Sequence, residues 1–189
     1  MKRALIAVVL TALFFTSGLG EEKARKVENF TLKDYNGVDH SLTDYKDAKA
    51  IVLMFIATQC PVSNAYNERM EALYKDYLEK NVVFLGINSN KQESVEEVKS
   101  HAKEKGLEFT ILKDHNNVVA DKLEASFTPE IYVLNQNGEL LYHGRIDDSR
   151  QEGKVEFKDL RKALDEILAG KSVSIPATKA FGCTIKRVS

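Results

Sequence analysis

The chain has 189 residues, with 27 lysines and arginines against 28 aspartates and glutamates, and 43% of its residues are hydrophobic. This length and apolar content suit one globular domain with a sizeable core. The formal net charge of −1 excludes the strongly basic surface typical of nucleic-acid-binding proteins, so no nucleic acid is expected as a partner.

The first twenty residues have the three-part layout of a secretory signal peptide. Lys2 and Arg3 precede the apolar run ALIAVVLTALFF, and the small residues of TSGLG follow it. The run is too short to cross a bilayer comfortably, so we predict cleavage near Gly20, with an uncleaved amphiphilic anchor as the alternative. The mature protein is then expected in the periplasm or outside the cell, with residues 21–26 as a flexible linker and no transmembrane segment.

Hydrophobic patterning alternates between the periods of strands and helices over most of the chain. Residues 27–45 alternate apolar and polar around Asn36-Gly37, which predicts a hairpin. The continuous apolar run at 50–57 predicts a strand buried on both faces. The other predicted elements are helices at 61–78, 94–106, 116–126 and 156–170, strands at 81–89 and 108–114, and a hairpin at 130–146.

Strands that alternate with helices predict one α/β domain over residues 27–170. Its central mixed sheet is expected to carry helices on both faces and an N-terminal β-hairpin extension. Residues 171–189 show no period and are predicted to form a C-terminal tail. The tail is expected to dock on the domain, because Phe181, Cys183 and Ile185 need a surface to pack against.

Cys60 lies where the predicted buried strand ends and the next helix begins. Pro61 suits the first helical position, because the amide proton that proline lacks has no partner there. A sulfur at this point faces free backbone N–H groups and the positive end of the helix dipole, and both favour the reactive thiolate. The position therefore predicts a reactive thiol; a buried, inert cysteine is the alternative.

Thr128-Pro129 comes directly before the strand that is predicted to start at residue 130. Proline is unusual so close to a central strand, because it cannot donate a ladder hydrogen bond. A cis peptide bond is one way to accommodate it, and an ordinary turn proline is the other.

The histidines and paired aspartates do not predict a metal site. Asp147-Asp148, at a strand end, is interpreted as a solvated acidic turn. The four histidines have no metal-ligand spacing and are also interpreted as solvated: His40, His101, His115 and His143. No metal and no cofactor are expected.

These features together resemble the thioredoxin-like superfamily, and within it the redoxin and peroxiredoxin-like (AhpC/TSA-type) branch of exported proteins. FIATQCPVS resembles the active-site segment of periplasmic thioredoxin-like reductases. TPEIYVLNQNGELLYHGRIDD is similar to the segment that begins at the cis-proline of that superfamily. CPVSNAY and FGCTIK resemble a peroxiredoxin-like subgroup. The resemblance implies a thioredoxin fold over the domain.

The resemblance also implies the roles of several residues. Cys60 is the implied nucleophile, and Pro61, Ser63, Thr128 and Pro129 are the implied surroundings of the substrate. Ser63 stands where dithiol reductases carry their second cysteine, so no local thiol is available to resolve a mixed disulfide. Its hydroxyl is expected either to donate a hydrogen bond to the Cys60 thiolate or to cap the helix.

The peroxiredoxin pattern is incomplete. Leu53 and Ala57 stand where that family has a proline and a threonine ahead of its peroxidatic cysteine. The family's arginine aligns near Thr128, and Arg145 is the nearest later candidate. These departures argue against efficient peroxide reduction.

Cys183 is the other cysteine of the chain, and three roles stay open for it. It resolves the Cys60 intermediate, or it pins the tail by a permanent disulfide, or it is unpaired or used between chains.

The leading hypothesis is an exported thiol-disulfide oxidoreductase that acts on protein or small-molecule thiols and disulfides with an unidentified redox partner. The first alternative is a thiol peroxidase acting on peroxide. The second is a non-enzymatic binding module with a structural Cys60–Cys183 bridge.

Overall fold

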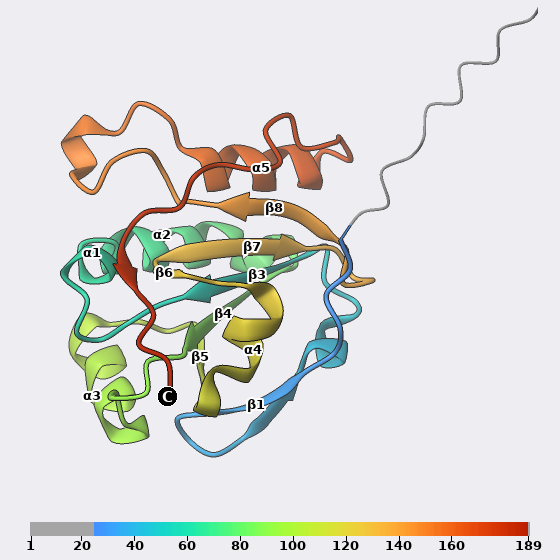
Figure 1. Cartoon of the computed structure of the whole chain (residues 1–189). Coiled ribbons are helices and arrows are strands. Elements are labelled where there is room, and N and C mark those ends of the chain that lie inside the picture. The colour runs from blue at the N-terminus through green and yellow to red at the C-terminus, as the bar shows by residue number, and fades with distance from the viewer. Residues whose placement is uncertain (1–24, 189) are drawn as a thin grey trace, which may run out of the picture.

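The computed structural model describes residues 25–188, so the predicted signal peptide lies outside the described part of the chain. Its centre is a seven-stranded sheet in the order β2-β1-β5-β4-β3-β7-β8 (Figure 1). β3, β4 and β5 pair in parallel, and the other neighbours pair antiparallel, which confirms the predicted mixed sheet. The strands are β1 (Thr31–Asp34), β2 (Asp39–Ser41), β3 (Ala50–Phe55), β4 (Val82–Asn88), β5 (Thr110–Lys113), β7 (Glu130–Leu134) and β8 (Leu140–Gly144), with β6 (Phe127–Thr128) and β9 (Cys183–Thr184) forming a separate pair.

Helices cover both faces of the sheet, as predicted. No helix among residues 25–188 has the length and apolar content to cross a membrane. The α-helices are α1 (Pro61–Asn64), α2 (Asn67–Tyr77), α3 (Val95–Lys105), α4 (Val118–Leu123) and α5 (Asp159–Leu168), and short 3₁₀ turns occur at Leu42–Tyr45, Leu78–Lys80, His115–Asn117 and Glu152–Lys154.

The central strand β3 explains why two layers of helices are needed. All six of its residues are buried, and successive side chains of a strand point to opposite faces. Val52 and Met54 belong to the core cluster that holds residues of α2, α3 and α5. Leu53 and Phe55 belong to the cluster on the other face, which holds α4.

The predicted N-terminal hairpin is present as β1 and β2. Gly37 has a φ of +85° at its turn, a conformation that glycine adopts without strain. Just before the hairpin, Lys26 pairs with Glu139 in an isolated bridge, and the Arg25 carbonyl accepts the N–H of Leu140 at 2.8 Å. These two described residues of the predicted linker therefore lie against the turn that leads into β8.

Two large apolar residues within the helices predicted at 61–78 and 156–170 lie outside the observed α-helices and are exposed. Leu78 is 52% exposed, because α2 ends at Tyr77 and the chain turns into β4 through Asn81 at φ +61°. Phe157 is 59% exposed, because α5 begins only at Asp159 and leaves Phe157 in the preceding loop. The predicted helix after residue 61 is also broken into α1 and α2.

Candidate active site

Cys60 lies at the N-cap of α1, with Pro61 at the start of the helix. Its Sγ accepts a hydrogen bond from the Ser63 backbone N–H at 3.3 Å, and Cys60 is only 4% exposed. Because α1 ends after four residues, the expected dipole of a longer helix is reduced. The direct N–H bond is therefore the main local stabilisation available to a thiolate here.

A disulfide joins Cys60 to Cys183 across a sequence separation of 123 residues. The two Cα atoms lie 6.0 Å apart, which is within the usual range for a disulfide. Neither cysteine is free in this state, which contradicts the alternative in which Cys183 is unpaired or used between chains. A resolving role and a permanent structural role are both compatible with the bond.

The loop around Pro129 lies against the Cys60 sulfur. The Thr128–Pro129 peptide bond is cis, the first of the two predicted alternatives. Thr128 and Pro129 are both buried, and the Thr128 carbonyl oxygen lies 3.4 Å from Cys60 Sγ. A disulfide carries no S–H proton, so this contact becomes a hydrogen bond only when Cys60 is a thiol.

The C-terminal tail is drawn in red in Figure 1, and hydrogen bonds hold it on both sides of Cys183. Ahead of it, the Thr178 N–H donates to the His143 carbonyl of β8 at 2.9 Å. Cys183 itself pairs antiparallel with Thr128 of β6. Beyond it, Ile185 is buried, and the Lys186 N–H donates to Asn90 Oδ1 at 2.7 Å. The tail therefore crosses the end of the sheet where α1 and the cis-proline loop meet.

Ser63 has a different role from either one predicted. Its side chain is fully buried, and its Oγ accepts the N–H of Ala57 at 3.2 Å. The hydroxyl therefore ties α1 to the loop that precedes Cys60. The hydroxyl neither donates to the Cys60 sulfur nor accepts from an N–H group of the first turn of α1; the contact to Cys60 Sγ comes from the Ser63 backbone N–H.

Glu93 lies beside the loop that leads to Cys60, and no local sequence pattern predicted its place there. It is 1% exposed, and its carboxylate accepts the backbone N–H groups of Thr58 at 2.9 Å and Gln59 at 3.1 Å. The side-chain amides of Asn88 and Asn90 donate to it as well. Burial raises the pKa of Glu93, but these four hydrogen bonds outweigh it and hold the pKa below its usual value. An ionised carboxylate therefore fixes the two residues directly ahead of Cys60.

The charge of Glu93 is balanced through Asn88. The buried Lys113 ammonium donates to Asn88 Oδ1 at 2.7 Å and to the Asn90 carbonyl at 2.7 Å. Burial lowers the pKa of Lys113, while the charges of Glu93 and Asp114 oppose that shift. Asn90 also accepts the Lys186 N–H, so this buried polar cluster contacts both the Cys60 loop and the tail.

A second buried carboxylate, Glu130, holds the cis-proline loop. It accepts the N–H groups of Ser126 and Phe127 at 2.7 and 2.8 Å, and it contacts His143 Nε2 at 2.7 Å. Burial raises the pKa of Glu130, but the bonds from His143, Ser126 and Phe127 bring it below its usual value. The interpretation of His143 as a solvated residue was therefore wrong.

Two other histidines also have side-chain partners, because strand and helix packing brings polar groups beside them. His40 contacts the Tyr45 hydroxyl, and His101 contacts the Asn67 amide. Within residues 25–188, no group of three or more His, Cys, Asp or Glu side chains is arranged to hold a metal ion.

Asp147 is buried rather than solvated, which corrects the interpretation of the acidic turn. Its carboxylate accepts hydrogen bonds from Arg69 at 2.5 Å and from the Tyr66 hydroxyl at 2.9 Å. The Arg69 guanidinium lies over the Tyr66 ring, 3.7 Å from the centroid, and Phe181 of the tail packs on the same ring. Tyr66 is therefore a core residue that supports the tail.

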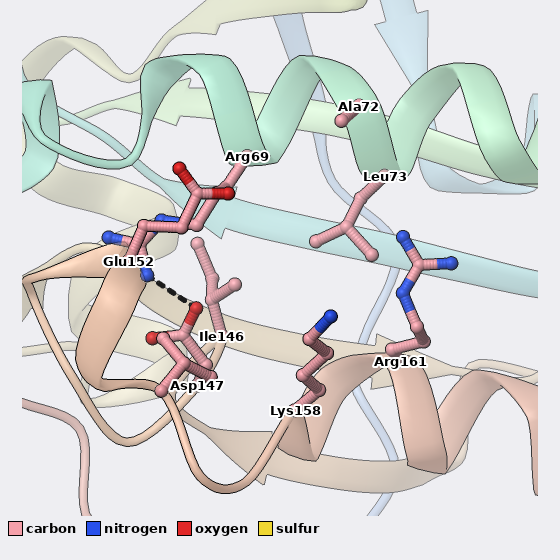
Figure 2. Close-up of a pocket in the computed structure, with 9 residues that line it drawn as sticks. Arg69, Ala72, Leu73, Ile146, Asp147, Glu152, Lys158 and Arg161 are labelled. Carbon is pink, nitrogen blue, oxygen red and sulfur yellow. Dashed lines mark hydrogen bonds and ion pairs between the residues drawn. The ribbon is translucent and has the colours of Figure 1, made fainter.

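Arg69 and Asp147 also line a pocket of about 270 Å³ between α2 and residues 146–161 (Figure 2). None of the six candidate site residues predicted from the sequence lines this pocket, so it is separate from the disulfide. Its other lining residues are Ala72, Leu73, Ile146, Glu152, Val155, Lys158 and Arg161.

The model of the AhpC/TSA family matches residues 24–143, well over half of the chain. The chain belongs to the AhpC/TSA family. The family resemblance predicted from the sequence is thereby confirmed.

Two curated relatives represent different redox chemistries. The chain is 27% identical over 147 residues to the thiol-disulfide oxidoreductase ResA of Geobacillus kaustophilus, covering 74% of this chain and 83% of the relative. It is also 27% identical over 130 residues to the chloroplastic peroxiredoxin Q of Gentiana triflora, covering 64% and 58%. An oxidoreductase activity is consistent with both relatives and with the family.

Solved structures confirm the thioredoxin fold. A hypothetical protein of Sinorhizobium meliloti has a TM-score of 0.82 and 31% identity, covering 88% of this chain and 94% of its own. A putative thiol:disulfide interchange protein DsbE of Chlorobium tepidum has a TM-score of 0.65 and 18% identity, covering 78% and 98%. Because the second structure is only 18% identical, it supports a similarity of fold alone.

Within this AhpC/TSA chain, the two positions that depart from the peroxiredoxin pattern have structural roles. Leu53 is fully buried in the sheet core, and the Ala57 N–H donates to Ser63. Neither side chain can donate a hydrogen bond to an oxygen near Cys60. The site lacks the threonine hydroxyl that the peroxiredoxin pattern would supply here.

Proposed function

We propose that the protein is an exported thiol-disulfide oxidoreductase in which Cys60 attacks and Cys183 resolves. The observation that carries this proposal is the Cys60–Cys183 disulfide beside the cis-proline loop. The ResA relative supports a disulfide-exchange reaction. The basic, apolar and small-residue segments of residues 1–20 support export, which would bring the disulfide into an oxidising compartment.

The forward reaction has two exchange steps. The Cys60 thiolate attacks one sulfur of a substrate disulfide, forms a mixed disulfide, and releases the other substrate sulfur as a thiolate that takes a proton from water. The Cys183 thiolate then attacks Cys60 Sγ, which forms the internal disulfide and releases the second substrate thiolate. The substrate disulfide gains two electrons, and the two protein cysteines lose them.

The tail anchor makes the second step intramolecular. The N–H of Thr178, five residues before Cys183, donates to the His143 carbonyl of β8, so Cys183 stays near Cys60 when the disulfide is reduced. A short tether gives a high effective concentration, which explains how a distant cysteine can replace the missing one at Ser63.

Regeneration needs an external dithiol protein, and burial selects the sulfur that it attacks. Cys60 is buried, whereas Cys183 is partly exposed. Attack on Cys183 expels Cys60 as the leaving thiolate, and the Ser63 N–H stabilises that charge.

The Cys183→Ser variant is expected to accumulate a mixed disulfide at Cys60 with insulin or glutathione disulfide. The reduced variant retains the attacking thiol but has no resolving thiol. Mass spectrometry of the acid-quenched reaction identifies the adduct.

The matched control is Cys60→Ser, which is expected to form no adduct at Cys183 at a comparable rate. A Cys60→Ser protein that kept full disulfide exchange would contradict the assignment of Cys60. A native Cys60–Cys183 bond that neither a dithiol protein nor glutathione can reduce would support the locked structural bridge instead.

Thiol peroxidase activity is the second candidate, and the peroxiredoxin Q relative supports it. Because Ala57 has no hydroxyl to hydrogen-bond to a peroxide, we expect Cys60 to react with hydrogen peroxide no faster than about ten times the rate of free cysteine. Stopped-flow oxidation of the reduced protein measures this rate, with Cys60→Ser as the control. A rate several orders of magnitude above free cysteine would reverse the ranking of the two candidates.

A further inference from the structure

In the oxidised protein, the tail forms a strand on the edge beside the cis-proline loop. β9 pairs antiparallel with β6, with Thr184 opposite Phe127 and Cys183 opposite Thr128. The Ile185 N–H continues the pairing by donating to the Ser126 carbonyl at 3.0 Å. The tail thus places a cysteine on an extended strand directly against Cys60, as a disulfide-bonded peptide would.

The residue ahead of Cys183 approaches the loop too closely to carry a side chain. A Cβ added to Gly182 would collide with the Thr128 carbonyl group. The φ of Gly182 lies outside the left-handed region, so contact with Thr128 rather than backbone conformation requires the glycine. Any strand that takes this path is therefore expected to have glycine directly before its cysteine.

The residues after Cys183 alternate between solvent and core. Thr184 is exposed, whereas Ile185 is 7% exposed and joins the cluster that includes Val119 and Leu123 of α4. An aliphatic side chain is thus accommodated two residues after the cysteine, and the residue between them is unrestricted.

We propose that residues 182–185 occupy the protein-substrate groove as an internal ligand, and that the groove prefers extended peptides of the pattern Gly-Cys-x-aliphatic. The inference rests on the proposed function, because the peptide cysteine is the sulfur that exchanges with Cys60. The tail and a substrate strand occupy β6 alternately. Reduction removes the covalent link, so the tail beyond Thr178 leaves β6 part of the time and competes there with a substrate strand. The returning tail then displaces the substrate as Cys183 closes the internal disulfide.

Three ten-residue peptides test the pattern on reduced Cys183→Ser protein. The first has the tail sequence KAFGCTIKRV, the second has alanine in place of its glycine, and the third has aspartate in place of its isoleucine. Each carries thionitrobenzoate as a mixed disulfide on its cysteine. Attack by Cys60 on the peptide sulfur releases coloured thionitrobenzoate and leaves the peptide bound to Cys60, which mass spectrometry verifies.

The tail-sequence peptide is expected to react about tenfold faster than either altered peptide, because backbone overlap or burial of a charge weakens binding of the altered strands. Equal rates for all three peptides would overturn the inference and leave the proposed function intact. The mixed disulfide of glutathione with thionitrobenzoate is the control. No reaction of Cys60 with that small disulfide would contradict the proposed function itself.

Competition by the tail is tested with Ile185→Asp in the Cys183→Ser protein. Loss of the buried Ile185 contact is expected to release the tail. The reaction of Cys60 with the tail-sequence peptide should then be about tenfold faster, while its reaction with the glutathione control should change little. An unchanged peptide rate in a variant that circular dichroism shows to be folded would contradict occupation of the groove by the tail.

Discussion

Reduced protein, or the Cys183→Ser variant, is expected to unfold with a free energy about 5 kcal/mol lower than that of oxidised protein, because the disulfide closes a very long loop. The sequence separation is 123 residues, which places the bond at the large end of the chain-entropy effect. Urea unfolding of the oxidised protein, the reduced protein and Cys183→Ser at one pH measures the difference. The last two should agree, because each lacks only the same bond.

The same difference sets the direction of electron transfer. If the fold stabilises the disulfide by about 5 kcal/mol relative to the unfolded chain, it lowers the reduction potential by roughly 100 mV. Titration against glutathione in buffer and in denaturant measures this shift. A negative shift makes the dithiol a stronger reductant, whereas equal potentials in the two conditions would show that tail docking contributes nothing to the bond.

The positions of Cys60 and Thr128 were predictable because their signals are local. The apolar run at 50–57, followed within three residues by Cys60-Pro61, specifies a buried strand and then a helix. Thr128-Pro129 directly precedes a second apolar run that forms β7 beside β3. Because β3 and β7 pair antiparallel, the C-terminal end of β3 and the N-terminal end of β7 lie side by side. This pairing brings the Cys60 sulfur and the proline loop together.

Glu93 and Asp147 were not predictable, because their partners are distant in sequence. Glu93 directly precedes Ser94, the N-cap of α3, so it resembles an ordinary acidic residue at a helix start. Its partner Thr58 lies 35 residues earlier, and Arg69 lies 78 residues before Asp147. Hydrophobic periodicity carries no information about such polar contacts, which only the folded loops bring together.

Glu93→Gln is expected to lower the free energy of unfolding by about 3 kcal/mol at neutral pH, because a neutral amide replaces a buried carboxylate that accepts four hydrogen bonds. Glutamine has the same shape but only one acceptor oxygen. Its amide group therefore faces another N–H donor, from Thr58 or Gln59. Glu96→Gln, at an exposed position in the first turn of α3, is the matched control and should change stability by no more than about 0.5 kcal/mol.

The pH dependence identifies the carboxylate as the cause. The folded pKa of Glu93 lies below its usual value, so its ionisation contributes stability above the unfolded pKa, and that contribution is lost as pH falls through the folded pKa. The gap between wild type and Glu93→Gln should therefore be full at pH 7 and shrink below roughly pH 4. Urea unfolding across this range measures the gap. A gap that stayed constant would assign the loss to packing rather than to charge, and the loop ahead of Cys60 would then not depend on an ionised Glu93.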